Sequence, residues 1–325
     1  MKKNIAIIMG GYSSEVEISL KSGNVVYKNI SKKIYNTYRV HILKQKWIVV
    51  DDDDNEYEIN KHDFSTIINN KKITFDCVFN AIHGNPGENG VILAYLELLG
   101  IKHTSAPSYQ MALTFNKRDT LSVVKDYNVA VAESYYLNQG ENINEEAIIK
   151  KVGLPCFVKP NNAGSSFGIS KVYNKENLKP AIEKAFKEDA EILIEEFLDG
   201  TEVTVGIIDY KGKIKVLPMT EIVAHNDFFD YQAKYLGESD EITPARISSE
   251  NHRKLTNIAA KVYSILKLKG ISRAEYIIVN NVPYFLEINT VPGLTEASLI
   301  PQQAEAAGIS LENLFHNAIE MALTN

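Results

Sequence analysis

Near its C-terminal end the chain places two carboxylates, Glu275 and Glu287, on segments that are otherwise apolar. The residues around an Asn-Asn pair at 280–281 are mostly β-branched or aromatic, so we expect a β-hairpin. With a three-residue loop, Glu275 lies across from Glu287 and Arg273 across from Asn289, all on one face. Facing carboxylates repel each other unless a cation lies between them, and carboxylate and amide oxygens are ligands that Mg²⁺ prefers. The hairpin therefore predicts a metal site.

A shorter loop would remove this site. With two loop residues the register slips by one, and Glu275 and Glu287 then point to opposite faces of the hairpin. The acids would be solvated on a surface hairpin. The residues of this segment leave both alternatives open.

A second group of residues could bind phosphate. Lys159 ends an apolar strand pattern, and the residues at 161–168 are mainly small, so their backbone N–H groups can approach phosphate oxygens closely. The Gly-Lys-Ser/Thr ending of a P-loop is missing and the loop leads into a strand, so a plain hairpin turn is the alternative. Lys117 could supply another phosphate contact, although a lone lysine is more often a solvated surface residue.

The segment 195–198 has the pattern of an interdomain crossover. It follows three aliphatic residues and precedes Gly200 and Glu202. The backbone of such a crossover can bind an adenine edge while a carboxylate binds ribose hydroxyls. A polar strand end is the alternative interpretation.

Two loops near the N-terminus follow predicted strands and should face one crevice. The loop at 10–19 lacks the spacing of a dinucleotide fingerprint, and its Glu15 could either favour the helix dipole or hold a substrate ammonium. His83 follows another strand of the same block, although a lone histidine is more often structural. Residues 227–237 combine aromatic bulk with a lysine and predict a lid.

Strand and helix patterns alternate in the first third of the chain, which predicts an α/β fold with a parallel, doubly wound sheet and a short meander around 47–50. Later blocks have patterns for further strands and for helices from about 116, 177, 250 and 311.

The composition is that of a soluble enzyme with two or three domains. With 325 residues, a net charge of −6 and a pI near 5.7, the chain is not expected to bind nucleic acid, and no apolar stretch approaches the length of a membrane span. Cys77 and Cys156 lie in strand-like apolar runs, where we expect buried free thiols and hence a reducing compartment.

Five motifs together resemble the D-alanine:D-alanine ligases of the ATP-grasp superfamily. They are Gly-Gly-x-Ser-x-Glu-x-Glu-Ile-Ser at 10–19, His-Gly-x-x-Gly-Glu-x-Gly at 83–90, Lys-Pro-x-x-x-Gly-Ser-Ser-x-Gly at 159–168, Tyr-x-x-Lys-Tyr at 231–235, and Leu-Glu-x-Asn-Thr-x-Pro-Gly-Leu-Thr at 286–295. Each motif is a modest signal, but their order and separations are specific, and the resemblance covers nearly the full length.

The resemblance implies a three-domain ATP-grasp architecture and an activity. The domains would be 1–107, Rossmann-like and substrate-binding; 108–200, the central ATP-grasp subdomain; and 201–325, the C-terminal subdomain with metal site and lid. The implied reaction joins two D-alanines through an acyl phosphate for peptidoglycan synthesis. ATP, two Mg²⁺ (or Mn²⁺), a cytoplasmic location and a homodimer are also implied.

Residue roles follow from the resemblance by motif position. The metal ligands would be Glu275, Glu287 and Asn289. The ATP-binding residues would be Lys117, Lys159, Ser166, Glu195, Glu196, Phe197, Leu198, Glu202 and Lys234. The substrate-binding residues would be Glu15, His83, Ser298 and Leu299. The catalytic group would comprise Arg273 and the Gly293 N–H at the oxyanion, and a hydrogen-bonded triad of Glu15, Ser165 and Tyr235.

Four positions depart from the commonest family pattern: Glu275, where aspartate is frequent, Asn89, Phe229 and Ala163. Glu275 lengthens a metal ligand, Asn89 and Ala163 each remove a charge, and Phe229 removes a hydroxyl. The rival hypotheses are a ligase that makes D-alanyl-D-lactate or another dipeptide, and a nucleotide-binding regulator without catalysis.

Overall fold

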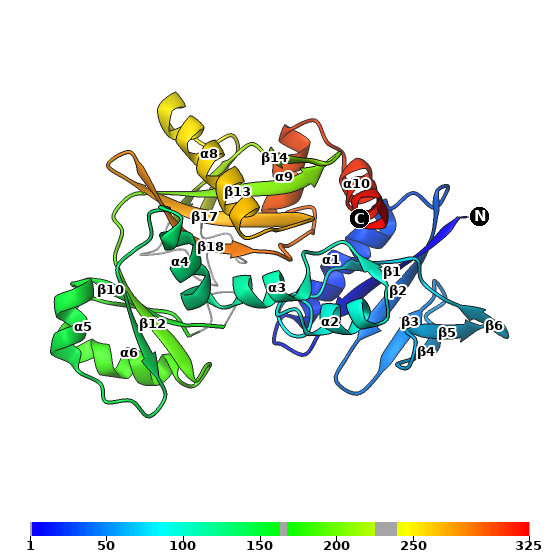
Figure 1. The fold of residues 1–325 in the computed structure, drawn as a ribbon, viewed down its shortest axis with the longest axis horizontal. Helices are drawn as coiled ribbons and strands as arrows, with labels where there is room; N and C mark the ends of the chain where they lie inside the picture. The colour runs from blue at the N-terminus through cyan, green and yellow to red at the C-terminus, as the bar shows by residue number, and fades with distance from the viewer. Residues whose placement is uncertain (1, 163–167, 225–238, 325) are drawn as a thin grey trace.

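The protein is built on three β-sheets (Figure 1). The structure is a computed structural model, and it describes residues 2–162, 168–224 and 239–324. Both cysteines, Cys77 and Cys156, are buried and free, as predicted. Within the described residues, no helix has the length and apolar character needed to cross a membrane.

The N-terminal sheet has eight strands in the order β6-β5-β4-β3-β2-β1-β7-β8. Their bounds are β1 (Lys3–Gly10), β2 (Tyr35–Ile42), β3 (Trp47–Val50), β4 (Glu56–Asn60), β5 (Ser65–Ile68), β6 (Lys71–Ile73), β7 (Cys77–Asn80) and β8 (Lys102–His103). Strands β2, β1, β7 and β8 pair in parallel, whereas β3 to β6 pair antiparallel. The expected parallel sheet is therefore the core of a mixed sheet, because the short connections from β2 to β6 cannot hold a crossover.

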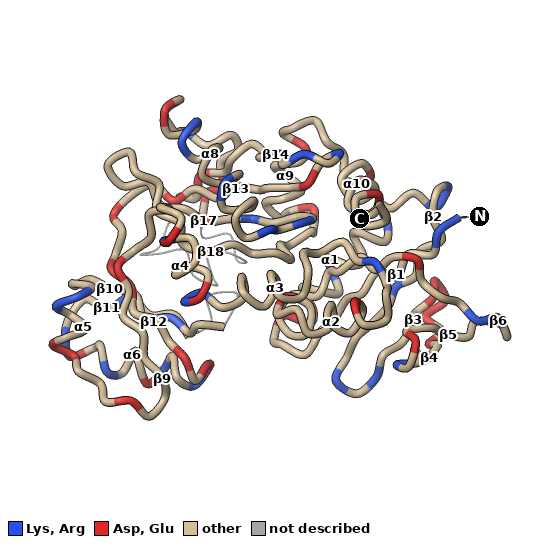
Figure 2. Tube along the Cα trace, viewed as in Figure 1, with Lys and Arg blue, Asp and Glu red and all other residues tan. Residues whose placement is uncertain are grey.

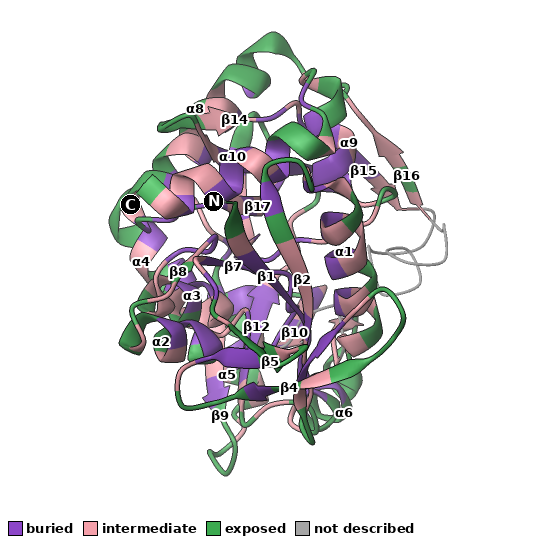
Figure 3. Cartoon of the chain, turned by 90° about the vertical axis from the view of Figure 1, so that its right-hand side faces the viewer, coloured by how far each residue is buried: buried purple, intermediate pink, exposed green. Residues whose placement is uncertain are grey.

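Helices cover both faces of the parallel strands, as a doubly wound arrangement requires (Figure 3). Helices α1 (Val16–Asn29) and α10 (Leu311–Thr324) share a core with the odd-numbered residues of β1, and α2 (Val91–Leu98) and α3 (Ser108–Phe115) share one with its even-numbered residues. Helix α10 thus brings the C-terminal end of the chain back to the first sheet.

The second sheet is antiparallel, in the order β11-β10-β12-β9. Its strands are β9 (Ser134–Asn138), β10 (Cys156–Pro160), β11 (Ser170–Val172) and β12 (Glu191–Glu196). Helices α5 (Glu145–Val152) and α6 (Leu178–Ala185), the latter preceded by the 3-10 turn η1 (Lys175–Asn177), bury one face of the sheet. Helix α4 (Lys117–Asp126) leads from α3 towards this sheet, and its N-cap Asn116 accepts a hydrogen bond from Asp119 N.

The third sheet runs in the order β16-β15-β13-β17-β18, with β14 paired to β13. Its bounds are β13 (Thr201–Tyr210), β14 (Lys213–Val216), β15 (Thr220–Ala224), β16 (Ser239–Ile242), β17 (Ile271–Val279) and β18 (Val282–Asn289), with helices α8 (Ser249–Ile265) and α9 (Leu299–Ala306) against it. A Cβ on Gly206 of β13 would lie 2.4 Å from the Gln303 side chain, so α9 can approach only a glycine here. Acidic and basic residues are interspersed along the described chain (Figure 2).

The β17–β18 hairpin has a two-residue loop, the shorter of the two alternatives that the sequence leaves open. Asn280 and Asn281 have φ of 49° and 62°, as a type I′ turn requires. A β-bulge then compensates for the slip: Tyr276 pairs with Phe285, but the preceding residue, Glu275, pairs with Glu287. Arg273 consequently pairs with Asn289. The predicted pairing of the carboxylates is confirmed, by a bulge that the sequence pattern did not indicate.

The turn leads to the first prediction. Replacing Asn280 by valine should lower the free energy of unfolding by about 1–2 kcal/mol, because a β-branched residue is strained at positive φ, and Asn280→Gly should cost little. Urea unfolding of the parent and both variants measures this. Equal losses in the two variants would show that the turn conformation is not the cause.

Candidate active site

A cavity of about 360 Å³ lies between the N-terminal sheet and the β17–β18 hairpin. Its walls come from the start of α1, the loop after β7, the start of α4, the hairpin, the loop after β18 and the start of α9. The predicted residues that line it are Glu15, His83, Lys117, Arg273, Glu287, Asn289, Gly293, Ser298 and Leu299. The fold therefore brings together residues that are more than 280 positions apart in the chain.

The facing carboxylates of the hairpin are each paired with a cation of the protein. Glu287 Oε2 lies 3.2 Å from Lys117 Nζ, and Glu275 Oε1 lies 2.8 Å from an Arg273 guanidinium nitrogen. Asn289 Oδ1 accepts a hydrogen bond of 2.8 Å from Val291 N, and an amide oxygen has a second lone pair. Among the described residues, no cluster of three or more His, Cys, Asp or Glu side chains has the arrangement of a metal site. The predicted set contains only two such side chains and an amide.

Of the predicted nucleotide residues, Lys159, Glu195 and Glu196 lie on the second sheet, and Phe197 and Leu198 directly follow it. Lys159 Nζ lies 2.7 Å from Glu195 Oε2, and both side chains are largely buried. Burial alone would lower the pKa of the Lys159 ammonium, but Glu195, with Glu287 and Glu275, raises it above its usual value. Lys159 is therefore a charged group close to the hairpin carboxylates.

The remaining crossover residues differ in what their side chains contact. Glu196 accepts a hydrogen bond of 2.9 Å from Glu133 N, which commits one carboxylate oxygen to the backbone. The Phe197 ring has the Lys171 ammonium 4.1 Å from its centroid. Leu198 is half-buried, and Glu202 lies near the start of β13.

His83 uses both ring nitrogens to hold the loop after β18. Its Nδ1 lies 2.7 Å from the carbonyl oxygen of Val291, which can only accept, so Nδ1 carries the proton. Burial lowers the pKa of His83 and keeps the ring neutral, so Nε2 accepts from the Ser22 hydroxyl at 3.1 Å. Ser22 Oγ in turn accepts from Leu294 N at 3.2 Å. These hydrogen bonds fix the backbone on both sides of Gly293.

The start of α9 offers backbone donors to the same cavity. Ser298 is the N-cap residue of α9, but its side chain makes no capping hydrogen bond and instead lies 2.7 Å from Thr295 Oγ1. The first N–H groups of a helix have no partner within the helix and suit an anion. A Cβ on Gly293 would lie 2.8 Å from Ser298 Oγ, so the two loops approach each other closely.

The predicted lid and several of its partners lie outside the described residues. These are Ser165, Ser166, Lys234 and Tyr235, together with Ala163 and Phe229. Their predicted roles stay predictions.

Comparison with known proteins identifies the family. The model for the D-ala D-ala ligase N-terminus matches residues 4–106, and the model for its C-terminus matches residues 120–320. Proteins described as D-alanine–D-alanine ligases are 65% identical over 321 residues in Flavobacterium johnsoniae and 58% identical over 323 residues in Christiangramia forsetii, and each comparison covers 99% of both chains. The chain belongs to the D-alanine–D-alanine ligase family.

Solved structures of the ligase family have the same fold. The VanG D-Ala:D-Ser ligase from Enterococcus faecalis is 30% identical with a TM-score of 0.86, over 99% of this chain and 100% of that one. A D-alanine–D-alanine ligase from Bacillus anthracis complexed with ATP is 27% identical with a TM-score of 0.79, over 99% of this chain and 97% of that one.

Two acidic residues of the ligase cavity were missed by the sequence analysis. Glu88 and Glu241 both line it, and burial raises the pKa of each carboxyl. The pKa of Glu88 is raised to about 8, first by burial and next by the negative charge of Glu15. The N–H of Gly84 donates a hydrogen bond to Glu88 Oε2 at 3.0 Å. The Gly-Glu of the 83–90 motif was a signal for Glu88, but Glu241 belongs to no motif.

The raised pKa of Glu88 predicts a pH dependence of stability. The folded protein holds this proton up to about pH 8, whereas the unfolded chain releases it near pH 4.5, so the stability that Glu88 contributes is full below pH 4.5 and is lost as pH rises through 8. Glu88→Gln should abolish this decline. Urea midpoints at pH 5, 6.5 and 8 test it, with the exposed Glu17→Gln as control. Profiles with the same slope in the parent and Glu88→Gln would contradict it.

Proposed function

We propose that this protein joins two molecules of D-alanine into D-alanyl-D-alanine, with conversion of ATP to ADP and phosphate, in peptidoglycan precursor synthesis. The observation that carries the proposal is that one cavity brings together the Glu15 carboxylate, the Arg273 guanidinium and the helix start at Ser298. These groups suit a substrate ammonium, an oxyanion and a carboxylate respectively. The full-length similarity to D-alanine–D-alanine ligases gives the same function.

The residues of the hairpin fit two Mg²⁺ or Mn²⁺ ions. Glu275 and Glu287 are cross-strand partners, and Asn289 follows two residues later on the same face, so that three hard oxygen donors converge. When bound, the ions would neutralise phosphate charge that opposes attack on the γ-phosphorus. Lys117, now paired with Glu287, would be released towards the phosphates.

In the first step the carboxylate of one D-alanine attacks the γ-phosphorus of ATP. The bond from the γ-phosphorus to the bridging oxygen breaks, and ADP and an acyl phosphate form. Lys117 and Lys159 would contact the phosphates, with Lys234 at the γ-phosphate, and Glu15 would hold the ammonium of this D-alanine. The crossover residues 195–198 would bind adenine and Glu202 the ribose.

In the second step the amine of another D-alanine, after loss of a proton, attacks the acyl carbon. A tetrahedral oxyanion forms, and phosphate leaves as the carbonyl is restored. Arg273 and the Gly293 N–H would stabilise the oxyanion. Ser298 and the Leu299 N–H would bind the second carboxylate, and Glu15, Ser165 and Tyr235 would link the lid to the N-terminal domain. Closure would keep water from the acyl phosphate.

We also propose three domains, 1–107, 108–200 and 201–325, and a cytoplasmic location. The three sheets support the boundaries, because β8 ends at His103, the second sheet ends at Glu196 and the third begins at Thr201. Helix α10 belongs to the last segment but packs against the first sheet.

A homodimer is proposed on the apolar surface of α2 and α3. Val91 and Leu98 lie seven residues apart on α2 and are 58% and 88% exposed, and Tyr109 on α3 is 70% exposed. Positions seven apart share a helix face, and α2 and α3 are neighbours, so these exposed apolar residues are candidates for an interface. A second copy of the chain would bury them.

Leu98→Asp should therefore convert a dimer into a monomer, because a desolvated carboxylate is costly in an apolar interface. Sedimentation analysis measures the mass. Ile67→Asp, which changes a 64%-exposed residue on β5, is the control and should remain dimeric. A dimeric Leu98→Asp variant would place the interface elsewhere.

Glu287→Gln should leave the fold intact and reduce turnover at limiting Mg²⁺ by about 100-fold or more, since metal stabilisation of developing charge is worth several kcal/mol and about 1.4 kcal/mol is tenfold. D-alanine-dependent ADP release measures the rate. Turnover near that of the parent would show that Glu287 does not hold the metal.

The second substrate is predicted to be D-alanine. Tyr235 matches the family position associated with dipeptide formation, and a phenol stays neutral over roughly pH 6 to 9, below its usual pKa of about 10. D-alanine, D-lactate and D-serine are offered together with ATP, and the products are separated at several pH values. D-alanyl-D-alanine is expected to dominate throughout. This specificity is refuted if the main product is D-alanyl-D-lactate at acidic pH or D-alanyl-D-serine at any pH. The ligase function is refuted if ATP is turned over and no dipeptide forms.

A further inference from the structure

The proposed reaction brings two ammonium groups into the active-site cavity, and Glu15 receives only that of the first D-alanine. The N–H groups at the start of α9 receive the carboxylate of the second amino acid, which leaves its ammonium without a partner. This ammonium must lose a proton before its nitrogen can attack, because a protonated nitrogen has no free electron pair. A carboxylate beside it would bind the ammonium and accept the proton.

Among the described residues, the carboxylates that line this cavity are Glu15, Glu88, Glu241 and Glu287. Glu287 belongs to the proposed metal ligands. Burial raises the pKa of Glu88 to about 8, so its carboxyl is mostly protonated at neutral pH and cannot accept a proton. Glu241 is the carboxylate that has no role in the reaction so far.

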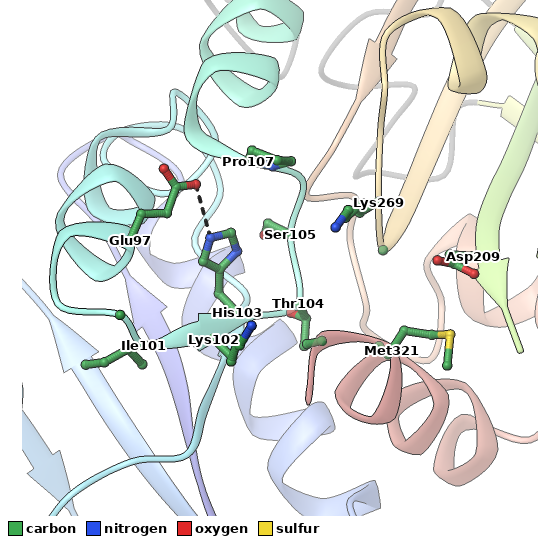
Figure 4. A pocket seen from close by; sticks show the side chains of 14 residues that line it. Glu97, Ile101, Lys102, His103, Thr104, Ser105, Pro107, Asp209, Lys269 and Met321 are labelled. Atoms are coloured by element: carbon green, nitrogen blue, oxygen red, sulfur yellow. Dashed lines mark hydrogen bonds and ion pairs between the residues drawn. The ribbon is translucent and has the colours of Figure 1, made fainter. Parts of the chain in front are cut away.

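A second cavity, of about 270 Å³, supplies no further carboxylate to the reaction. It lies between β8, the end of β13 and α10, and its lining shares no residue with the lining of the active-site cavity (Figure 4). Its acidic residues, Glu97 and Asp209, therefore do not face the reacting atoms.

Glu241 lies on the side of the cavity where the second amino acid would bind. Its Oε2 accepts a hydrogen bond from Gln302 Nε2 at 3.3 Å, and the same nitrogen donates to Ala297 O at 2.9 Å. Ala297 directly precedes Ser298, the N-cap residue of α9. The ammonium and the carboxylate of an α-amino acid are bonded to one carbon, so an amino acid whose carboxylate binds at Ser298 has its ammonium close to this position.

Among the described residues, Arg273 is the charged group whose field acts on Glu241. On β15 the partner of Glu241 is the apolar Ile222, and the acidic Glu221 pairs with the next residue of β16, so it points to the opposite face of the sheet. Helix α9 contributes the neutral amide of Gln302. Because Arg273 is the proposed oxyanion donor, Glu241 is close enough to the reacting centre to interact with it electrostatically.

The surroundings of Glu241 suit a proton acceptor. Burial raises the pKa of its carboxyl above the usual value, while the hydrogen bond from Gln302 and the charge of Arg273 oppose this effect. A carboxylate with a raised pKa is a stronger base and takes a proton from an ammonium more readily.

We propose that Glu241 is a catalytic residue of the second step, which binds the ammonium of the second amino acid and accepts one of its protons. This role rests on the proposed function. One N–H bond breaks, the proton passes to a carboxylate oxygen of Glu241, and the freed electron pair forms the bond from nitrogen to the acyl carbon. When the tetrahedral intermediate collapses, the bond from the acyl carbon to the phosphate oxygen breaks, and the second proton lost by the nitrogen leaves with the phosphate.

Glu241→Gln tests this role, because a glutamine keeps an oxygen that accepts from Gln302 and removes the basic carboxylate. The full-length protein is given ATP and D-alanine, with or without an excess of hydroxylamine, a nucleophile that is uncharged at neutral pH and needs no proton acceptor. In the variant, kcat for the dipeptide should fall about 100-fold at neutral pH, as expected for loss of a general base, whereas hydroxamate should form at the rate of the parent. The deficit in dipeptide should shrink as pH rises, since more of the D-alanine amine is then deprotonated in solution.

Glu305→Gln, a change of an exposed residue of α9 that does not line the cavity, is the control and should behave as the parent with both nucleophiles. Equal losses of dipeptide and hydroxamate in Glu241→Gln would show that Glu241 only supports the structure of the site. Dipeptide formation at the rate of the parent would show that another group takes the proton. Either result overturns the proposal, whereas a parent protein that forms neither product would refute the proposed function itself, and this role with it.

Discussion

Two carboxylates held face to face, Glu275 and Glu287, are the constraint on which the site depends. Like charges that are partly buried are destabilising unless cations compensate them. Here the compensation comes from three directions: Arg273 on the same hairpin, Lys117 at the start of α4, and Lys159 on β10, whose pKa these acids help to raise. Because Lys159 of the second sheet compensates Glu275 and Glu287 of the third sheet electrostatically, the facing acids favour close approach of the two sheets.

On the proposed roles, this arrangement would also allow the lysines to exchange their carboxylate partners for the phosphates of ATP. On the same roles, Lys117 and Lys159, which lie close to these carboxylates, are also the groups that would neutralise the phosphates of ATP. Divalent ions would then replace the lysines at the carboxylates. The charge balance of the site can be kept in both states without an unpaired buried charge.

A second, neutral set of contacts positions the amino-acid side of the cavity. His83, from the N-terminal sheet, and Ser22, from α1, hold the backbone of Val291 and Leu294, between which Gly293 lies. A protonated His83 could no longer accept from the Ser22 hydroxyl, which would have to turn and accept from Nε2 instead. Burial, which lowers the pKa of His83, protects this arrangement of hydrogen bonds.

Local patterns in the sequence were sufficient to identify the residues that could carry out the chemistry. They also identified many of the helices and strands on which these residues lie. The bounds of β12 agree with the apolar pattern at 191–196, and α4 starts at Lys117, next to the predicted start at about 116. Helices α3 and α5, each of eight residues, were missed, since a segment of that length gives only a weak period. Motif resemblance supplied the family and the expected roles. Tertiary structure alone decided the bulge that returns Glu275 to Glu287, the mixed pairing of the first sheet, the cations that meet the acids and the raised pKa of Glu88. These features depend on which distant segments pair and on how far water is excluded between them, and neither is encoded in a local pattern of residues.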